Sequence, residues 1–196
     1  MKKALIFGIN GQDGKILSEI LLEKKYHVIG THYRKIKQNK FKLLKLNIID
    51  FKKVKKIIRE YKPGEIYNFT GKSDLKTNEK DFFLSEKINN LAVLNILNSI
   101  KNTNIKFFQP ITSEIYGNYK SEKKISLNTS YNPGSSYAIS KLSSLFYMRL
   151  FRKKFNVHCV SGILFNHESQ FRKNKFVTKM IIENVTKIYF GKIKQF

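Results

Sequence analysis

A glycine-rich loop between an apolar strand and a helix constrains this chain more than any other feature. Residues 3–8 are mostly apolar and predict a buried strand, and residues 12–24 carry apolar side chains at helical spacing. Glycines between two such elements permit a tight turn and let the backbone approach a pyrophosphate, which the helix N-terminus attracts. An ordinary tight turn is the alternative interpretation. The dinucleotide-binding interpretation places these residues at the cofactor: Gly8, Ile9, Asn10, Gly11, Gln12, Asp13 and Gly14.

The rest of the chain continues this alternation of strand and helix. We expect further strands at 26–31, 43–48, 65–69, 105–109 and 157–165, and helices at 51–61, 85–101, 135–155 and 176–190. In the helix at 85–101, the spacing predicts that Ile88, Leu91 and Leu94 face the core, with Ile96 or Leu97. Such alternation predicts an α/β fold: a doubly wound parallel sheet with helices on both faces, a Rossmann-like NAD(P)-binding domain.

The chain is strongly basic, with 38 lysines and arginines against 14 aspartates and glutamates, a formal charge of +24 over 196 residues. Such a charge attracts polyanions. Specific base readout favours arginine, however, and the lysines are spread along the chain. We therefore do not expect specific nucleic-acid binding, which a binding titration across salt would test. The only arginines are Arg34, Arg59, Arg149, Arg152 and Arg172.

Two absences bear on the compartment. Cys159 is the only cysteine, so an internal disulfide is excluded. No stretch reaches the roughly 18 to 20 apolar residues that a membrane span needs, and the N-terminal residues are typical of a strand rather than a signal peptide. We expect a cytoplasmic protein without a membrane partner.

The end of the second predicted strand indicates which dinucleotide is bound. An acid there would bind the ribose 2′-hydroxyl of NAD. Residues 30–35 contain no aspartate or glutamate, but they include Arg34 and Lys35. Two cations favour a 2′-phosphate, so the sequence predicts NADP with Arg34 as a contact. The alternative is that both are solvated surface charges.

Tyr137 and Lys141 form a Tyr-x-x-x-Lys pair at the start of the helix predicted over 135–155. A spacing of four places both side chains on one helical face. An ammonium near a phenol favours the phenolate, so we expect the pKa of Tyr137 to lie below its usual value of roughly 10. Tyr137 is then a candidate general base. A surface tyrosine–lysine pair is the alternative.

Thr112, Ser113 and Glu114 follow the fifth predicted strand, at the edge where parallel sheets carry their chemistry. The Thr112 hydroxyl is a candidate hydrogen-bond partner for a substrate carbonyl or alcohol. Oxidising an alcohol does not need the neighbouring carboxylate, whereas removing a proton next to a newly formed ketone does. Glu114 therefore separates a dehydratase from a reductase, unless it is simply a loop acid or a helix-start acid.

Together these motifs resemble the GDP-mannose 4,6-dehydratase family of the extended short-chain dehydrogenases/reductases. The run 162–169, Gly-Ile-Leu-Phe-Asn-His-Glu-Ser, followed by Phe-Val-Thr at 176–178, resembles this family more than the neighbouring epimerases or dTDP-glucose dehydratases. The other matching motifs are the Gly-Gln-Asp-Gly of the glycine loop, Glu-Ile-Tyr-Asn at 65–68, Thr112-Ser113-Glu114 with Gly117, and the Tyr137–Lys141 pair.

The resemblance implies a hydro-lyase of nucleotide-sugar metabolism, of the kind that begins GDP-fucose biosynthesis. GDP-mannose would become GDP-4-dehydro-6-deoxy-mannose and water, with hydride passing from C4 to NADP and returning to C6. Tyr137 would take the C4 hydroxyl proton, Thr112 would polarise the C4 oxygen, and Lys141 would hold Tyr137 and the nicotinamide ribose. Glu114 would remove the C5 proton.

The resemblance also implies binding residues, with some departures from the family. Asn47 and Ile48 stand where the family has Asp-Leu, and residues 69–73 replace its Leu-Ala-Ala-Gln-Ser. Lys179 stands where the family has arginine, on the substrate side with Asn166. The remaining cofactor contacts implied by position are Phe69, Thr70, Gly71, Ser73, His167 and Arg172.

Family members continue into a small C-terminal domain. The resemblance therefore implies an NADP-binding domain over 1–165 and the start of a truncated substrate-binding region over 166–196. It also implies homodimers or homotetramers, with the Tyr137 helix at an interface. Two further hypotheses stay open: another sugar-nucleotide epimerase or reductase of the same superfamily, and a catalytically impaired NADP-binding fragment.

Overall fold

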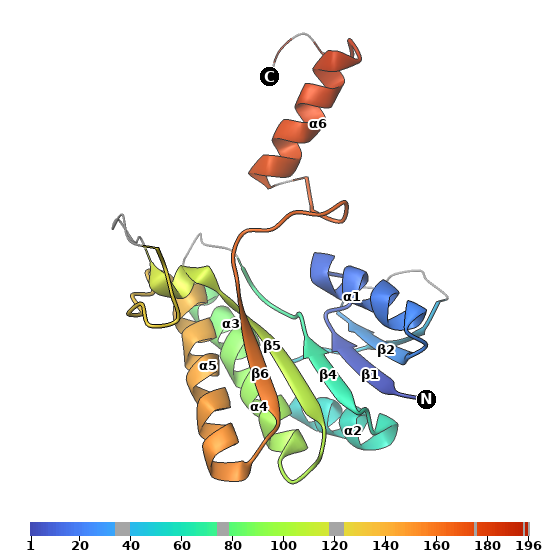
Figure 1. Ribbon diagram of the computed structural model, residues 1–196, viewed down its shortest axis with the longest axis vertical. Helices are drawn as coiled ribbons and strands as arrows, with labels where there is room; N and C mark the ends of the chain where they lie inside the picture. Colours follow the sequence, from blue (N-terminus) through green and yellow to red (C-terminus); the bar gives the residue numbers. More distant parts are fainter. Residues whose placement is uncertain (34–39, 74–78, 118–123, 175, 194, 196) are drawn as a thin grey trace. The chain divides into compact units, whose positions relative to one another are not determined.

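A six-stranded parallel sheet forms the centre of the fold (Figure 1). The computed structural model describes residues 1–33, 40–73, 79–117, 124–174, 176–193 and 195. The strand order is β3-β2-β1-β4-β5-β6, and every neighbouring pair is parallel. This confirms the α/β prediction. The strands are β1 (Lys3–Phe7), β2 (His27–His32), β3 (Lys42–Lys45), β4 (Glu65–Asn68), β5 (Lys106–Thr112) and β6 (Cys159–Leu164).

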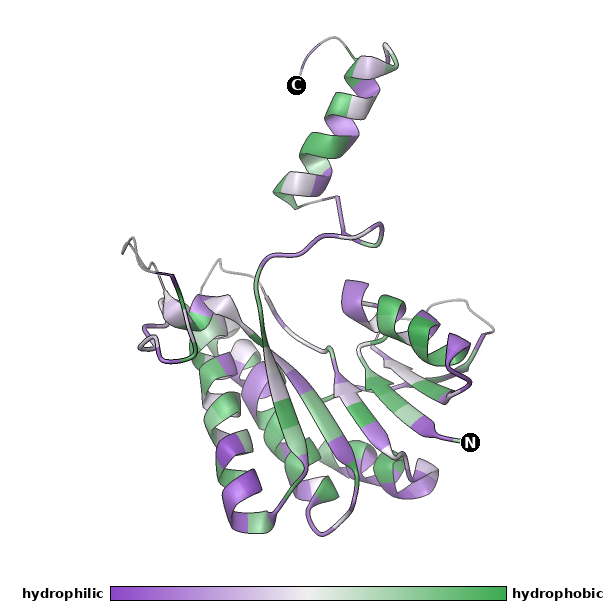
Figure 2. Ribbon diagram, in the orientation of Figure 1, coloured by the Kyte–Doolittle hydropathy of each residue, from purple (hydrophilic) through white to green (hydrophobic). Residues whose placement is uncertain are grey.

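Helices cover both faces of this sheet, as the alternation predicts. Along β1, Leu5 and Phe7 pack into the core under α2, α4 and α5, whereas Ala4 and Ile6 pack on the α1 side. Figure 2 shows hydrophobic residues concentrated along the central strands. The helices are α1 (Gln12–Glu23), α2 (Phe51–Tyr61), α3 (Glu79–Glu86), α4 (Ala92–Ile100), α5 (Ser136–Phe155) and α6 (Val177–Tyr189).

The strand order reverses between β1 and β4, which creates a crevice at their carboxyl ends. Gly8 follows β1 there with a φ of +75°, a left-handed conformation. A Cβ at Gly8 would lie 2.8 Å from the backbone of Phe69 and of Thr70, which follow β4. Only glycine fits this close approach.

The helix predicted over 85–101 differs in the structure. It begins earlier, at α3, and a π-helical turn, η1 (Lys87–Leu91), separates α3 from α4. The extra residue in a π turn rotates the helix face. As a result Leu91, which was expected to face the core, is 44% exposed, and Asn89 and Asn90 are buried instead.

The fifth strand also extends beyond its predicted end at residue 109, since β5 continues through Pro110 to Thr112. β4 pairs with β5 only as far as Phe108, whereas β6 pairs with it along its whole carboxyl half. One edge of β5 is therefore open beyond Phe108, and a residue without an N–H is tolerated there.

The chain separates into two compact units, Met1–Phe165 and Asn166–Phe196. The first contains the sheet with α1 to α5, and the second contains α6. Within the described ranges, no helix combines the length and apolarity that a membrane crossing requires. The same residues include no group of three or more His, Cys, Asp or Glu that could hold a metal ion.

Candidate active site

The carboxyl edge of the sheet brings together most of the predicted site residues of the first unit. The glycine loop follows β1, residues Phe69 to Ser73 follow β4, and Thr112 ends β5. Glu114 lies in the short 3₁₀ turn η2 (Ser113–Tyr116). Tyr137 and Lys141 occupy the first turns of α5, whose N-terminus is capped because the Ser135 hydroxyl accepts a 3.1 Å hydrogen bond from the Ala138 N–H.

The glycine loop is a tight turn, in which the Gly11 N–H donates to the Gly8 carbonyl at 3.0 Å. A Cβ at Gly14 would lie 2.7 Å from that same carbonyl oxygen, so this helical position also requires glycine. Gly11 caps α1 without any side-chain hydrogen bond. Asn10 Oδ1 is buried with no hydrogen-bond partner among the described residues. The glycine turn and the α1 N-terminus fit a diphosphate, whereas the Asn10 oxygen, an acceptor, can bind only a donor such as a ribose hydroxyl.

Tyr137 lies near Thr112, whose hydroxyl favours the phenolate and lowers the pKa of the phenol. Burial raises the pKa of Tyr137, and the nearby carboxylates of Glu114 and Asp13 raise it further, against the lowering effect of Thr112. The sequence predicted the opposite direction. Spacing alone could not weigh desolvation of the phenolate against a neighbouring ammonium.

Lys141 is 4% exposed, and its ammonium donates a 3.0 Å hydrogen bond to the Pro110 carbonyl. Burial lowers the pKa of Lys141 to about 8, because a charged amine is poorly solvated there. A Cβ at Gly71 would lie 4.0 Å from Lys141 Nζ, so the loop after β4 passes beside the ammonium.

Two buried amides complete this arrangement, and the sequence did not indicate their role. Asn68 Nδ2 donates to Gln109 Oε1 at 2.7 Å, and Gln109 Nε2 donates to the Pro110 carbonyl at 3.0 Å. Both residues are fully buried. Their only sequence signal is a polar residue in a predicted strand, at the end of β4 for Asn68 and within β5 for Gln109.

The predicted contacts near β3 and β4 lie at the same edge. Asn47 is exposed, and its Oδ1 accepts a 3.3 Å hydrogen bond from the Ile49 N–H. Ile48 is buried in the core, and the Phe69 ring packs against Phe108 with centroids 6.2 Å apart. The Thr70 N–H donates to Asn68 Oδ1 at 3.2 Å, whereas Gly71 and Ser73 are exposed.

The remaining predicted contacts lie outside the described residues or in the second unit. Arg34 lies outside the described residues. The other four belong to the unit Asn166–Phe196, which is described by itself. There, Asn166 and His167 are exposed, the Arg172 guanidinium lies 3.7 Å above the Phe176 ring, and Lys179 Nζ lies 3.9 Å from Glu183. Their assigned roles stay predictions.

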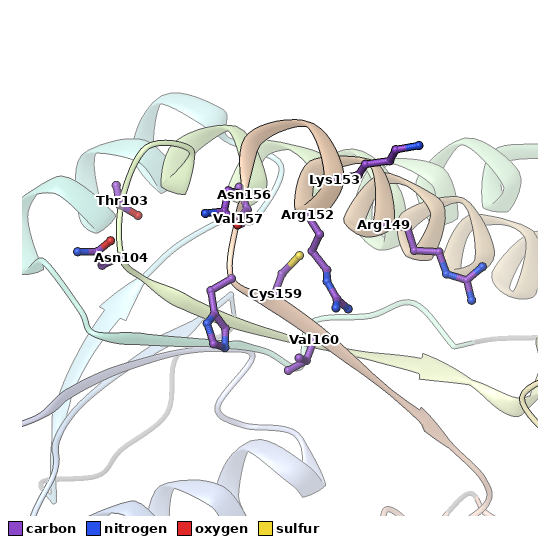
Figure 3. Close-up of a pocket in the computed structure, with 10 residues that line it drawn as sticks. Thr103, Asn104, Arg149, Arg152, Lys153, Asn156, Val157, Cys159 and Val160 are labelled. Carbon is purple, nitrogen blue, oxygen red and sulfur yellow. The ribbon is translucent and has the colours of Figure 1, made fainter.

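A depression of about 880 Å³ lies elsewhere, at the C-terminal end of α5 and the start of β6 (Figure 3). Arg149, Arg152 and Lys153 line it, together with residues that precede β5 and begin β6. It includes none of the predicted site residues. Cations in the last turns of α5 complement the helix dipole, which accounts for their placement without a ligand.

Comparison with known proteins identifies the family. A family model described as GDP-mannose 4,6 dehydratase matches residues 5–196. The chain therefore belongs to the GDP-mannose 4,6-dehydratase family. A family member from Cricetulus griseus is 36% identical over 216 residues, which include all of this chain and 58% of that protein. The chain thus spans little more than half the length of this relative.

Solved structures share the fold of this chain at lower sequence identity. A dTDP-glucose 4,6-dehydratase from Bacillus anthracis, in complex with NAD, superposes with a TM-score of 0.83 at 18% identity, over 95% of this chain and 62% of that one. The enzyme WbmH of Bordetella bronchiseptica, in complex with NAD⁺, gives 0.73 at 25% identity, over 85% and 56%.

The glycine at position 8 should be irreplaceable. We expect Gly8→Ala to lower the free energy of unfolding by about 3 kcal/mol, because it combines a left-handed φ with a backbone clash. Gly134→Ala is the matched control, since nothing lies within 4 Å of its Cβ position. It should change stability by less than about 0.5 kcal/mol. Urea denaturation measures both, and equal effects would contradict the packing argument.

Lys141→Met should stabilise the fold at neutral pH, because it removes a buried charge. The lowering of the Lys141 pKa from 10.5 to about 8 corresponds to an upper limit of about 3 kcal/mol. Wild-type stability should rise with pH between 8 and 10.5, where the unfolded chain binds more protons. The advantage of the variant should therefore shrink across that window. Urea denaturation at several pH values tests this, and a destabilised variant without pH dependence would contradict it.

Proposed function

We propose that this chain is the cofactor-binding part of a GDP-mannose 4,6-dehydratase, which converts GDP-mannose to GDP-4-dehydro-6-deoxy-mannose and water. One observation carries the proposal. Thr112 ends β5, Glu114 lies in η2, and Tyr137 lies in the first turn of α5, which packs against both β5 and η2. A base, a hydrogen-bond donor and a carboxylate as second acid/base group are what oxidation followed by elimination needs.

The cofactor that fits best is a nicotinamide dinucleotide, and we propose NADP. The α1 N-terminus and the glycine cradle suit a diphosphate. WbmH, which shares this fold, was solved with NAD⁺. The choice of NADP rests on the end of β2, where Thr31 and His32 carry no carboxylate and Arg34 follows in the sequence.

The glycine loop and the segment after β4 would hold NADP, whose chemistry would be hydride transfer from C4 of the sugar and back to C6. Tyr137 would take the C4 hydroxyl proton while Thr112 hydrogen-bonds the C4 oxygen. Burial alone keeps the phenol protonated, so a nearby cation must favour the phenolate. Lys141 lies on the same helical face and is the candidate, which would also hold the nicotinamide ribose.

Glu114 would act in the elimination step, which follows the oxidation at C4. Its side chain is exposed at the sheet edge, where a substrate can reach it. A ketone at C4 makes the C5 proton acidic, and the carboxylate would remove that proton. Glu114, now protonated, or a neighbouring acid would give a proton to the C6 hydroxyl, which leaves as water. An epimerase or a reductase of the same superfamily would not need this step.

The second unit would supply the remaining contacts. We propose that His167 and Arg172 reach the cofactor and that Asn166 and Lys179 reach the nucleotide sugar.

A homodimer or homotetramer would bury the outer face of α5, where Ile139, Phe146 and Leu150 are exposed. A catalytically impaired NADP-binding fragment is the second candidate function.

Glu114→Gln tests the chemistry. With NADP present, we expect the wild-type chain to convert GDP-mannose to a 4-keto sugar and the variant to lose at least about a hundredfold of that turnover. The matched control is Glu60→Gln, an exposed carboxylate on α2, which should keep full activity. Unchanged turnover in Glu114→Gln would favour an epimerase or reductase. NADP binding without any product from the wild-type chain would favour the impaired fragment.

A further inference from the structure

The sheet opens between β4 and β5 at its carboxyl edge, beside the candidate active site. The pairing of these two strands ends where Tyr67 meets Phe108. Within a strand, alternate residues direct their N–H and carbonyl groups to the same neighbouring strand. The Lys106 N–H donates to the Gly64 carbonyl on the β4 side, so the Pro110 carbonyl, an even number of residues further along, also faces that side. It lies beyond the end of the ladder, where side chains can reach it.

Two buried amide side chains occupy this opening. Asn68 Nδ2 donates to Gln109 Oε1 at 2.7 Å, and Gln109 Nε2 donates to the Pro110 carbonyl at 3.0 Å. Asn68 Oδ1 in turn accepts a 3.2 Å hydrogen bond from the Thr70 N–H. A flipped amide at either position would place two donors or two acceptors face to face. The direction of this chain of hydrogen bonds, from Thr70 to Pro110, is therefore fixed.

Lys141 uses the same carbonyl oxygen. Its ammonium donates to the Pro110 carbonyl at 3.0 Å, and a carbonyl oxygen can accept from two donors. The ammonium also lies beside Gly71, since a Cβ there would be 4.0 Å from Lys141 Nζ. Gly71 directly follows Thr70, where the chain of hydrogen bonds begins. These polar contacts therefore form a ring that starts and ends in the loop after β4 and passes through Gln109.

We propose that Gln109 is a positioning residue that fixes the Pro110 carbonyl and, through it, the place of the Lys141 ammonium. Gln109 is 0% exposed, so it reaches no ligand itself and acts through the lysine. The proposed function places the nicotinamide ribose at Lys141 and the diphosphate at the glycine loop. Gln109 therefore sets the geometry of the nicotinamide half of the site, a step that rests on the proposed function.

Gln109→Met tests the positioning role in the unliganded chain. Methionine has nearly the same volume, but it removes both the donor to Pro110 and the acceptor for Asn68. The ¹³C NMR signal of Lys141 Cε, identified by its loss in Lys141→Met, reports the titration of the ammonium, whose pKa burial lowers to about 8. If the carbonyl is no longer held, the ammonium loses its acceptor, and the titration midpoint should fall by at least about half a pH unit.

Two ligands extend the test to the cofactor, since NADPH carries the nicotinamide riboside and 2′,5′-ADP lacks it. We expect Gln109→Met to weaken NADPH binding about fivefold and to change the affinity for 2′,5′-ADP less than about twofold. Asn90→Leu is the matched control, because it removes another buried amide, which donates to Glu86 and, at 2.9 Å, to Ser143 Oγ. It should lower thermal stability and leave both the Lys141 midpoint and the NADPH affinity unchanged.

An unchanged midpoint in Gln109→Met would overturn the positioning role, because the carbonyl would then keep its place without the amide. A higher midpoint would overturn it too, since the amide would then compete with Lys141 for the carbonyl. Equal weakening of NADPH and 2′,5′-ADP would show a general structural role and contradict the inference as well.

A second variant covers the case in which Gln109→Met does not fold. Asn68→Leu removes the donor that orients Gln109, so the Lys141 midpoint should move in the same direction by less, and the same criteria apply. A wild-type chain that binds no NADPH would contradict the proposed function, whereas the midpoint, measured without ligand, would still decide the role of Gln109.

Discussion

A chain of buried hydrogen bonds crosses the core from β4 to α5, and the active-site geometry depends on it. Asn68 donates to Gln109, and Gln109 and Lys141 both donate to the carbonyl of Pro110. In a low-dielectric interior each of these groups would be costly without its partner, the ammonium most of all. The Pro110 carbonyl therefore determines where α5 lies against β5. Tyr137, one turn before Lys141, is thereby held at the edge of the sheet where Thr112 ends β5.

Much of the fold was predictable from the sequence, because buried parallel strands are apolar runs and their helices carry one apolar face. The exceptions have local causes. Leu91 was expected inside and is exposed, since the π turn rotates the helix by an extra residue. Pro110 was expected to end its strand, yet β5 continues because β6 still pairs with it. Neither the pairing of β6 with β5 nor the extra residue of the π turn changes the spacing of apolar residues in the sequence, so neither could be predicted from that spacing.

Candidate site residues that belong to a local sequence motif were predictable, whereas residues that are brought to the site by packing of distant segments were not. The glycine loop, Thr112 and the Tyr137–Lys141 spacing all follow from local sequence. Gln109 does not, because its partner Asn68 is 41 residues away. The buried charge of Lys141 likewise depends on the assembled core. A chain selected only for stability would place an apolar residue there, so the lysine itself indicates function.

Hydrogen exchange with and without NADP tests most directly whether the carboxyl edge of the sheet is the cofactor site. We predict slower exchange of backbone amides at residues 8–14 and 69–72 when NADP is added, because these two segments line the crevice between β1 and β4. The basic depression at residues 149–160 is the competing anion site, and its exchange should stay unchanged. Protection at 149–160 with none in the glycine loop would contradict the account.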